Sequence, residues 1–230
     1  MAARFTIACL DMAGTTVADE GSVMAAFDAA MELFGIAPGQ PGYDRATQIV
    51  HVTMGQSKIE VFRQILGDES SAAAANRVFE ERYAVEVSAG AIAPLPGAAE
   101  TLAALRAAGI RVCLVTGFSP STRNAILDVL GWWPLIDLAL SPADVGRGRP
   151  WPDLPLTALV RLGGGAVSEL AVAGDTASDV ESGLRAGAGL VAGVLTGSGS
   201  REELEKAGAP HILDSITGIV ALLGLAIEGA

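Results

Sequence analysis

The sequence has almost no lysine and no cluster of positive charge. Of its 230 residues, 15 are lysine or arginine and 26 are aspartate or glutamate, which gives a formal net charge of −11. Lys58 and Lys206 are the only lysines, and no segment is rich in basic residues. Because nucleic-acid binding needs clustered cations that neutralise phosphates, we expect no nucleic-acid partner.

Long hydrophobic runs and cysteines are also scarce. The longest mainly apolar stretch, 216–227, is shorter than the roughly 18–20 residues that span a bilayer, and it reads better as a final amphipathic helix. Residues 1–10 lack the pattern of a cleavable signal. We therefore expect no membrane partner and a cytoplasmic location. Cys9 and Cys113 both lie in apolar, strand-like segments, which favours buried thiols over a disulfide.

What the sequence does contain is enough apolar material for a large core, since 50% of its residues are hydrophobic. From about residue 95 onward, short apolar runs alternate with helical stretches, which is typical of βαβ units in a parallel sheet. We predict an α/β fold with a Rossmann-like parallel sheet. The predicted strands are 4–10, 110–116, 135–140, 170–174 and 189–195, and the predicted helices begin near residue 120 and span 152–162 and 175–186.

Residues 20–90 interrupt this alternation. Helical periodicity covers 24–34, 58–66 and 72–85, and no convincing strand lies between them. The segment 93–97 contains two prolines and a glycine and is predicted to be a linker. We therefore predict an α/β core made of residues 1–18 and 93–230, with a helical domain of residues 19–92 inserted after the first strand.

Two loops that follow predicted strands carry groups suited to a phosphate. Asp11 is followed by Gly14 and Thr15, which place a carboxylate beside backbone N–H groups that are expected to be free. Thr116 and Gly117 follow the strand at 110–116, where a hydroxyl can donate to a phosphoryl oxygen and glycine lets the backbone come close. An ordinary turn is the alternative for each loop taken alone.

Two further loops supply charge of both signs. Arg149 precedes a predicted helix and offers a cation that could balance a carboxylate and a phosphate, with a basic surface loop as the alternative. Asp175 and Asp179 are four residues apart, which predicts that both lie on one face of a helix. Their oxygens are ligands that Mg²⁺ prefers. An N-cap explains one aspartate but not the pair. Ligands bind at the carboxyl ends of strands in such sheets, so the four loops together predict a magnesium-dependent phosphoryl-transfer site.

This set of loops resembles the haloacid dehalogenase superfamily over essentially the whole chain. The resemblance implies that Asp11 is a nucleophile that becomes a phospho-aspartate, and that Thr116 and Arg149 bind the phosphoryl group. It also implies that the helical insert is a cap domain and that a homodimer forms through its helices. The metal ligands that the resemblance implies are Asp11, the backbone carbonyl of Ala13, Asp175 and Asp179.

Ala13 departs from most phosphatases of that superfamily, which have a second aspartate there to protonate the leaving alkoxide. The motif Asp-x-Ala-Gly-Thr-Thr, with arginine in the third loop, resembles the phosphonoacetaldehyde hydrolase (phosphonatase) branch, which cleaves a carbon–phosphorus bond. In that branch a cap lysine forms an imine with the substrate aldehyde, and the imine accepts the electrons of the breaking bond. Met54, Gly55 and Lys58 match its Met-Gly-x-x-Lys motif, which implies that Lys58 is the imine-forming residue.

Two family features are absent. Val61 stands where that branch has a histidine, and Phe118 where it has a tyrosine. His51 lies seven residues before Lys58, a spacing that would place both on one face of a helix, although a surface or packing role is equally open. These departures favour a related 2-oxoalkyl phosphonate as an alternative to phosphonoacetaldehyde.

The leading hypothesis is therefore a hydrolase that cleaves a C–P bond through an imine at Lys58 and a phospho-aspartate at Asp11. One alternative is a phosphomonoester phosphatase that acts on a small phosphorylated metabolite. A non-catalytic protein that binds a phosphometabolite or a partner is an alternative of another class, and the retained nucleophile, acidic pair and phosphate ligands argue against it. In each case the expected ligand is a small phosphonate or phosphorylated metabolite.

Overall fold

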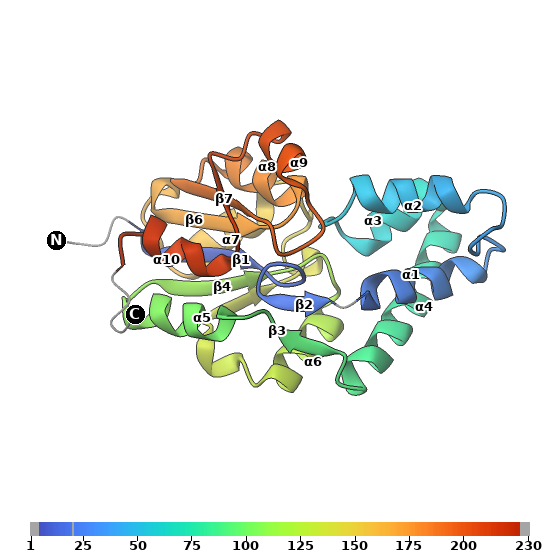
Figure 1. Cartoon of the computed structure of the whole chain (residues 1–230), viewed down its shortest axis with the longest axis horizontal. Helices are drawn as coiled ribbons and strands as arrows, with labels where there is room; N and C mark the ends of the chain where they lie inside the picture. Colours follow the sequence, from blue (N-terminus) through green and yellow to red (C-terminus); the bar gives the residue numbers. More distant parts are fainter. Residues whose placement is uncertain (1–4, 20, 226–230) are drawn as a thin grey trace.

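A six-stranded parallel sheet holds the first predicted strand, β1 (Ile7–Asp11), in its interior (Figure 1). The computed structural model describes residues 5–19 and 21–225. Every residue of β1 is buried, because strands lie on both sides of it and helices cover both faces. The predicted Rossmann-like parallel sheet is confirmed. Its order is β5-β4-β1-β6-β7-β8, with β4 (Arg111–Val115), β5 (Leu138–Leu140), β6 (Leu170–Gly174), β7 (Leu190–Val194) and β8 (His211–Leu213).

Alternate residues of β1 point to opposite faces of the sheet, and each face packs against its own helices. Ala8 and Leu10 belong to a core shared with α5, α6 and α10. Cys9 packs on the other face, beside Cys113 of β4 and residues of α7. Both cysteines are free and fully buried, which confirms the expected thiols. The helices of this core are α5 (Ala98–Ala107), α6 (Pro120–Leu130), α7 (Asp153–Arg161), α8 (Ala177–Ala186), α9 (Arg201–Lys206) and α10 (Ile219–Leu222).

Four helices between β2 (Val17–Asp19) and β3 (Ile92–Pro94) form a helical unit, here called the cap, at one end of the molecule (Figure 1). They are α1 (Ser22–Glu32), α2 (Tyr43–Val52), α3 (Lys58–Leu66) and α4 (Glu69–Ser88). Aromatic residues make up only 5% of the sequence, yet several gather here. The ring of Phe62 on α3 lies 6.1 Å from Phe27 of α1 and 6.0 Å from Phe79 of α4, so these contacts join three helices. The boundaries of the cap at residues 19 and 92 stay a prediction.

A short two-stranded antiparallel ribbon of β2 and β3 joins the cap to the core. The segment 93–97 was expected to be a linker only, but its first residues belong to β3. Pro94 is tolerated in this strand because a two-stranded ribbon leaves one edge of each strand without ladder bonds. This ribbon therefore fixes where the chain leaves the core and where it returns to it.

Other elements also differ from the sequence predictions. Helix α2 was not predicted, because only Ala46 and Val50 of its residues are buried and its apolar stripe is thin. The expected final helix over 216–227 is a 3₁₀ turn, η4 (Ile216–Gly218), followed by α10, and residues 226 and 227 lie outside the described residues. Residue 4 of the first predicted strand also lies outside them. Short 3₁₀ turns η1 (Trp133–Leu135), η2 (Pro142–Asp144) and η3 (Val167–Glu169) connect elements of the core. Within the described residues, no helix has the length and apolar character needed to cross a bilayer.

Candidate active site

The polar loops predicted from the sequence meet at the carboxyl edge of the sheet. Asp11 ends β1, Thr116 follows β4, and Asp175 follows β6. Because β1 lies between β4 and β6, the three loops are neighbours, although they are far apart in the chain. The hydroxyl of Thr15, for example, donates to Asp175 Oδ1 at 3.2 Å across 160 residues. This edge is where open parallel sheets bind their ligands.

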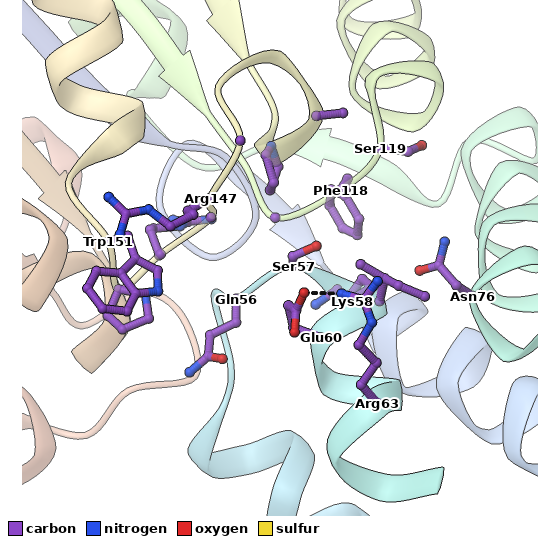
Figure 2. Close-up of a pocket in the computed structure, with 18 of the residues that line it drawn as sticks. Gln56, Ser57, Lys58, Glu60, Arg63, Asn76, Phe118, Ser119, Arg147 and Trp151 are labelled. Carbon is purple, nitrogen blue, oxygen red and sulfur yellow. Dashed lines mark hydrogen bonds and ion pairs between the residues drawn. The ribbon is translucent and has the colours of Figure 1, made fainter. Parts of the chain in front are cut away.

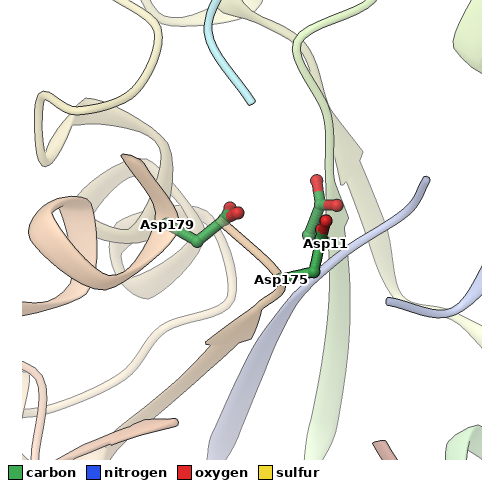
Figure 3. Close-up of side chains that lie close together, drawn as sticks. All are labelled: Asp11, Asp175 and Asp179. Atoms are coloured by element: carbon green, nitrogen blue, oxygen red, sulfur yellow. The ribbon is translucent and has the colours of Figure 1, made fainter. Parts of the chain in front are cut away.

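Three buried aspartates, Asp11, Asp175 and Asp179, form a carboxylate cluster at this edge (Figure 3). One oxygen of each lies within 4.8 Å of the others. Burial raises the pKa of Asp11 well above its usual range, and the charges of Asp179 and Asp175 add to this against the opposing effect of Arg149. Burial, with the charge of Asp179, also raises the pKa of Asp175 to about 6. The negative charge of the carboxylate cluster is therefore not fully balanced by the nearby cation Arg149.

The donor set fits a divalent cation. Arg149 Nη1 lies 2.6 Å from Asp11 Oδ1 and also pairs with Asp179 Oδ1. Three carboxylates thus face one guanidinium, and if all were ionised two negative charges would remain, which one divalent cation balances. Carboxylate oxygens are the ligands that Mg²⁺ prefers, so the three aspartates could hold it. Ala13 lines the same site, and its carbonyl stays a predicted ligand.

Arg149 is placed to bind an anion as well as to balance the aspartates. Its side chain is buried, and its Nε has no hydrogen-bond partner among the described residues. Asp11 and Asp179 raise the pKa of Arg149 above its usual range although burial acts in the opposite direction, so the guanidinium stays charged. A buried donor without a partner calls for an explanation, and a phosphoryl oxygen would supply the missing acceptor.

Asp175 and Asp179 converge, but not in the predicted way. Thr176 is the N-cap of α8, so Asp175 precedes the helix and does not share a helical face with Asp179. Instead, Asp179 closes a capping box in which its Oδ2 accepts from the backbone N–H of Thr176 at 3.1 Å. This turns the carboxylate back towards the end of β6. Gly174 leaves the room for it, since a Cβ there would lie 2.2 Å from Asp179 Cγ.

A cavity of about 330 Å³, here called the reaction cavity, opens beside the cluster. Its walls come from both the core loops and the cap. Thr15 and Asp179 are predicted site residues that do not line it, because the Thr15 side chain is fully buried and Asp179 is engaged by Thr176 and Arg149. The predicted residues that do line it are Asp11, Ala13, Gly14, Met54, Gly55, Lys58, Thr116, Gly117, Arg149 and Asp175.

The first loop also departs from expectation in its backbone. The N–H groups of Gly14 and Thr15 were expected to be free for a phosphate. Instead, Gly14 N donates to the Val17 carbonyl at 2.8 Å, and Thr15 N donates to the Met12 carbonyl at 3.1 Å. The turn that leads into β2 uses both donors. The role of Thr15 in this structure is therefore to hold Asp175.

Lys58, the first residue of α3, reaches the reaction cavity from the cap. Its Nζ lies 5.4 Å from the ring centroid of Phe118, which belongs to the core, and 5.8 Å from that of Phe79 on α4. Aromatic faces attract an ammonium group at such distances. Val61, in the place of the family histidine, is buried in the cap and has no group that can transfer a proton.

His51 does not share a helix with Lys58, so the expectation from their spacing is wrong. Helix α2 ends at Val52, and a turn containing Gly55, with a φ of 82°, separates it from α3. The Nε2 of His51 lies 3.1 Å from Glu203 Oε1 on α9, at an exposed site. In this structure His51 therefore joins the cap to the core surface.

Three residues after β7 also belong to the site and were not predicted. Ser198 donates to Asp175 Oδ2 from its backbone N–H at 2.8 Å and from its hydroxyl at 3.2 Å. Thr196 donates to the Gly14 carbonyl at 2.7 Å. Gly197 is required because a Cβ there would lie 2.0 Å from Asp175 Oδ2. The sequence feature that could have predicted these three residues is the segment 196–199, Thr-Gly-Ser-Gly, directly after a predicted strand.

The cap loop that precedes α3 lies against Gly117 of the core. A Cβ on Gly117 would lie 2.3 Å from the carbonyl oxygen of Gln56, and backbone atoms cannot move aside as a side-chain end can. We expect Gly117→Ala to displace the cap and to lower kcat/KM at least about tenfold, since small misplacements at a site are costly. Steady-state kinetics measure this. Gly165→Ala, whose Cβ would meet only the Glu169 side chain, is the control, and equal activity of the two variants would contradict the expectation.

The carboxylate cluster predicts how stability responds to pH and Mg²⁺. The pKa of Asp175 is raised to about 6 in the fold, so this group stabilises the metal-free protein fully below about pH 3.9, and that contribution is lost as the pH rises through about 6. We expect the metal-free Tm to fall by roughly 3–5 °C between about pH 5 and pH 7 from this group. Saturating Mg²⁺ binds the ionised form and should raise Tm more at pH 7 than at pH 5.

Differential scanning fluorimetry with and without Mg²⁺ checks this expectation. Asp175→Asn removes the titrating carboxylate and should flatten the pH dependence. A larger Mg²⁺ shift at pH 5 than at pH 7 would contradict the assignment of the cluster as the metal site.

Comparison with known proteins agrees with this geometry. The chain is 28% identical over 214 residues to the "probable phosphatase IndB" of Dickeya dadantii, a match that covers 91% of this chain and 90% of that protein. It is also 28% identical over 228 residues to the phosphonoacetaldehyde hydrolase of Bacillus cereus, which covers 90% of this chain and 83% of that one. The crystal structure of a phosphonoacetaldehyde hydrolase-like protein from Oleispira antarctica superposes with a TM-score of 0.82 at 24% identity, over 96% of this chain and 92% of that chain, and supports the fold.

The family comparison is broader than any single relative. The sequence model of the haloacid dehalogenase-like hydrolases matches residues 5–187, which include β1, the cap helices and the strands that carry the carboxylate cluster. The resemblance inferred from the four loops is confirmed at this level. The chain belongs to the haloacid dehalogenase-like hydrolase family and is a hydrolase.

Proposed function

We propose that this protein is a magnesium-dependent hydrolase that cleaves the C–P bond of phosphonoacetaldehyde or a related 2-oxoalkyl phosphonate. The observation that carries the proposal is that Lys58 of the cap and Asp11 of the core line one cavity of about 330 Å³. An imine-forming amine and a carboxylate nucleophile at one small site are what such a cleavage requires. The full-length similarity to a phosphonoacetaldehyde hydrolase adds support.

The chemistry assigns one role to each of these two residues. The amine of Lys58 attacks the substrate carbonyl, and loss of water gives a protonated imine. An oxygen of Asp11 then attacks phosphorus while the C–P bond breaks, and the electron pair of that bond moves into the imine to give an enamine. Water hydrolyses the phospho-aspartate to phosphate, and protonation and hydrolysis of the enamine release the carbonyl product and restore Lys58.

The surrounding residues hold the phosphoryl group. Thr116 and Arg149 line the cavity beside Asp11, so a hydroxyl and a guanidinium can donate to the phosphoryl oxygens. When bound at the aspartates, Mg²⁺ would supply further neutralisation of the phosphoryl charge. Ala13 provides no acid beside the leaving group, and none is needed, because the group that leaves is an enamine carbon and not an alkoxide.

We also propose the cap boundaries at 19 and 92, with the core formed by 1–18 and 93–230. A homodimer through the cap helices belongs to the same proposal, since the resemblance to phosphonatases implies it.

A phosphomonoester phosphatase is a second candidate. The match to the probable phosphatase IndB covers 91% of this chain, and buried Val61 leaves the proposed imine without the histidine of the phosphonatase branch. Against this candidate, Ala13 cannot protonate an alkoxide. The two functions therefore predict different dependence on Lys58.

Borohydride trapping tests the proposal directly. The protein is incubated with phosphonoacetaldehyde and Mg²⁺, reduced with borohydride, and analysed by intact mass and peptide mapping. A substrate-dependent adduct on Lys58, together with phosphate release by the unreduced enzyme, is the expected result. No adduct, with phosphate released from ordinary sugar or alkyl phosphates instead, would replace the proposal with the phosphatase.

A further inference from the structure

A second cavity of about 650 Å³, here called the outer cavity, adjoins the reaction cavity between the cap and the core (Figure 2). The two share Gln56, Lys58, Gly117, Phe118 and Arg149 as lining residues. In Figure 2, Lys58, Arg63 and Asn76 approach from the cap, and Arg147 and Trp151 approach from the core. Lys58 therefore stands at the border of two spaces, of which only the smaller contains Asp11.

The geometry of an imine explains why two spaces meet at this residue. A carbonyl carbon bonded to Lys58 Nζ carries two other substituents. One is the phosphonomethyl group, which must reach Asp11 and therefore occupies the reaction cavity. The other points away from Asp11, and the outer cavity is the second space that Lys58 borders. In phosphonoacetaldehyde that second substituent is only a hydrogen atom, whereas the outer cavity has the size of a ligand pocket in its own right.

Apart from Lys58 and Arg149, which the imine and the phosphoryl group would occupy, the cations of the outer cavity are paired with other protein groups. Arg63 pairs with Glu60 and Glu69. Arg147 pairs with Asp153 at 2.9 Å, and its guanidinium lies over the Trp151 ring. These pairs leave little attraction for a charged substituent.

Glu80 of α4 is engaged as well. It accepts hydrogen bonds from Ser119 and Thr122 at the N-terminus of α6, so its carboxylate links the cap to the core. A carboxylate held by a helix N-terminus is not available to a ligand.

The amide side chains of the outer cavity, unlike its paired charged groups, have no hydrogen-bond partner in the part of the protein that the structure describes. Gln56, Gln64 and Asn76 line the outer cavity, and their side chains make no hydrogen bond with the described residues. Each carboxamide offers both donors and an acceptor. Such groups match hydroxyl or amide functions, which need one of each, better than they match a charged group.

We propose that the outer cavity binds a neutral, hydroxylated or amide-bearing substituent on the carbonyl carbon of the substrate, with Asn76 and Gln64 as its hydrogen-bonding partners. The preferred substrate is then a 2-oxoalkyl phosphonate whose second substituent carries hydroxyl or amide groups. This inference rests on the proposed function, because the imine at Lys58 fixes which way the substituent points.

Binding measurements test it separately from turnover. Asp11→Asn enzyme with Mg²⁺ is titrated calorimetrically with 2-oxopropyl phosphonate and with 3,4-dihydroxy-2-oxobutyl phosphonate. Because a neutral hydrogen bond changes an equilibrium constant by roughly two- to tenfold, we expect the dihydroxy compound to bind at least about fivefold more tightly. Adding Asn76→Leu or Gln64→Leu should reduce that ratio at least about twofold. Gln48→Leu, an exposed glutamine on α2 outside both cavities, is the matched control and should keep it.

The outcomes separate the two proposals. Equal affinity for the two phosphonates would overturn the assignment of the outer cavity and would make it a solvent entrance only. A ratio that all three variants lower equally would overturn it as well. Phosphate release by the unmodified enzyme from phosphonoacetaldehyde and from the two 2-oxoalkyl phosphonates reports the C–P cleavage by itself, so no release from any of the three beside a preserved affinity ratio would refute the proposed function and leave only a binding site for the substituent.

Discussion

Lys58→Met is expected to abolish phosphate release from phosphonoacetaldehyde, with a loss of at least about 10⁴-fold in kcat. Without the imine, the electrons of the C–P bond have no low-energy acceptor, and the leaving group would be a carbanion or enolate. Methionine keeps most of the length of the side chain and removes the ammonium group that lies near Phe79 and Phe118. The measurement is phosphate release under saturating substrate, with a thermal melt to check folding.

The scarcity of lysine makes this experiment unusually clear. The other lysine, Lys206, is exposed on α9, and Lys206→Met is the matched control that should keep full activity. A Lys58→Met enzyme that retains phosphonoacetaldehyde turnover within about tenfold would refute the imine mechanism. If the variant also hydrolyses alkyl phosphates as well as the parent does, the protein is a phosphatase.

Asp11→Asn should remove activity to a similar extent, at least about 10⁴-fold, towards every phosphorylated or phosphonylated substrate. The amide is a poor nucleophile, and both candidate hydrolase functions pass through the Asp11 carboxylate. This variant therefore separates an enzyme from a binding protein, whereas the Lys58 variant separates the two enzymes. Phosphate release and tight binding of a substrate, measured side by side, check it.

The same substitution has an opposite expected effect on stability. The pKa of Asp11 is raised in the fold by burial, so the ionised form disfavours folding at neutral pH in the absence of metal. Neutral asparagine relieves this, and Arg149 keeps its partner Asp179. We expect the metal-free Tm to be no lower than that of the parent, while Asp214→Asn at an exposed site changes neither Tm nor activity. A lower Tm with unchanged turnover would show that Asp11 is only structural.

The fold was largely predictable because its strongest determinants are local. The apolar runs that became β1, β4, β6 and β7 are buried on both faces, so they carry a continuous hydrophobic signal. Helix α3 begins and ends where its periodicity predicted, at Lys58 and Leu66. Helix α2 was missed because its buried stripe is too thin to give a period.

Most of the candidate site residues named from the sequence line one cavity in the structure, but their hydrogen bonds were not predicted. An aspartate at the end of a strand is predicted to lie at the edge of the sheet, but its hydrogen bonds depend on the backbone conformation of the turn that follows it. The N–H groups of Gly14 and Thr15 are used by the turn itself, and Ser198 holds Asp175 from a loop that carries no charged residue. The outer cavity was beyond prediction, because it lies between α3 and α4 of the cap and core loops that are distant from them in the sequence.

The position of β1 has a consequence for how the chain folds. Its partners come much later, as the contact between Thr6 and Glu169 across 163 residues illustrates. During synthesis β1 therefore stays unpaired on both edges until the cap helices and β4 are made, and its second edge stays unpaired until β6 is made. Closing so long a loop is entropically costly and slows folding, so the nascent core should be a substrate for chaperones until β4 and β6 emerge. Asp11 at the end of β1 can therefore meet Arg149 and the other two aspartates of the carboxylate cluster only after these later segments have been made.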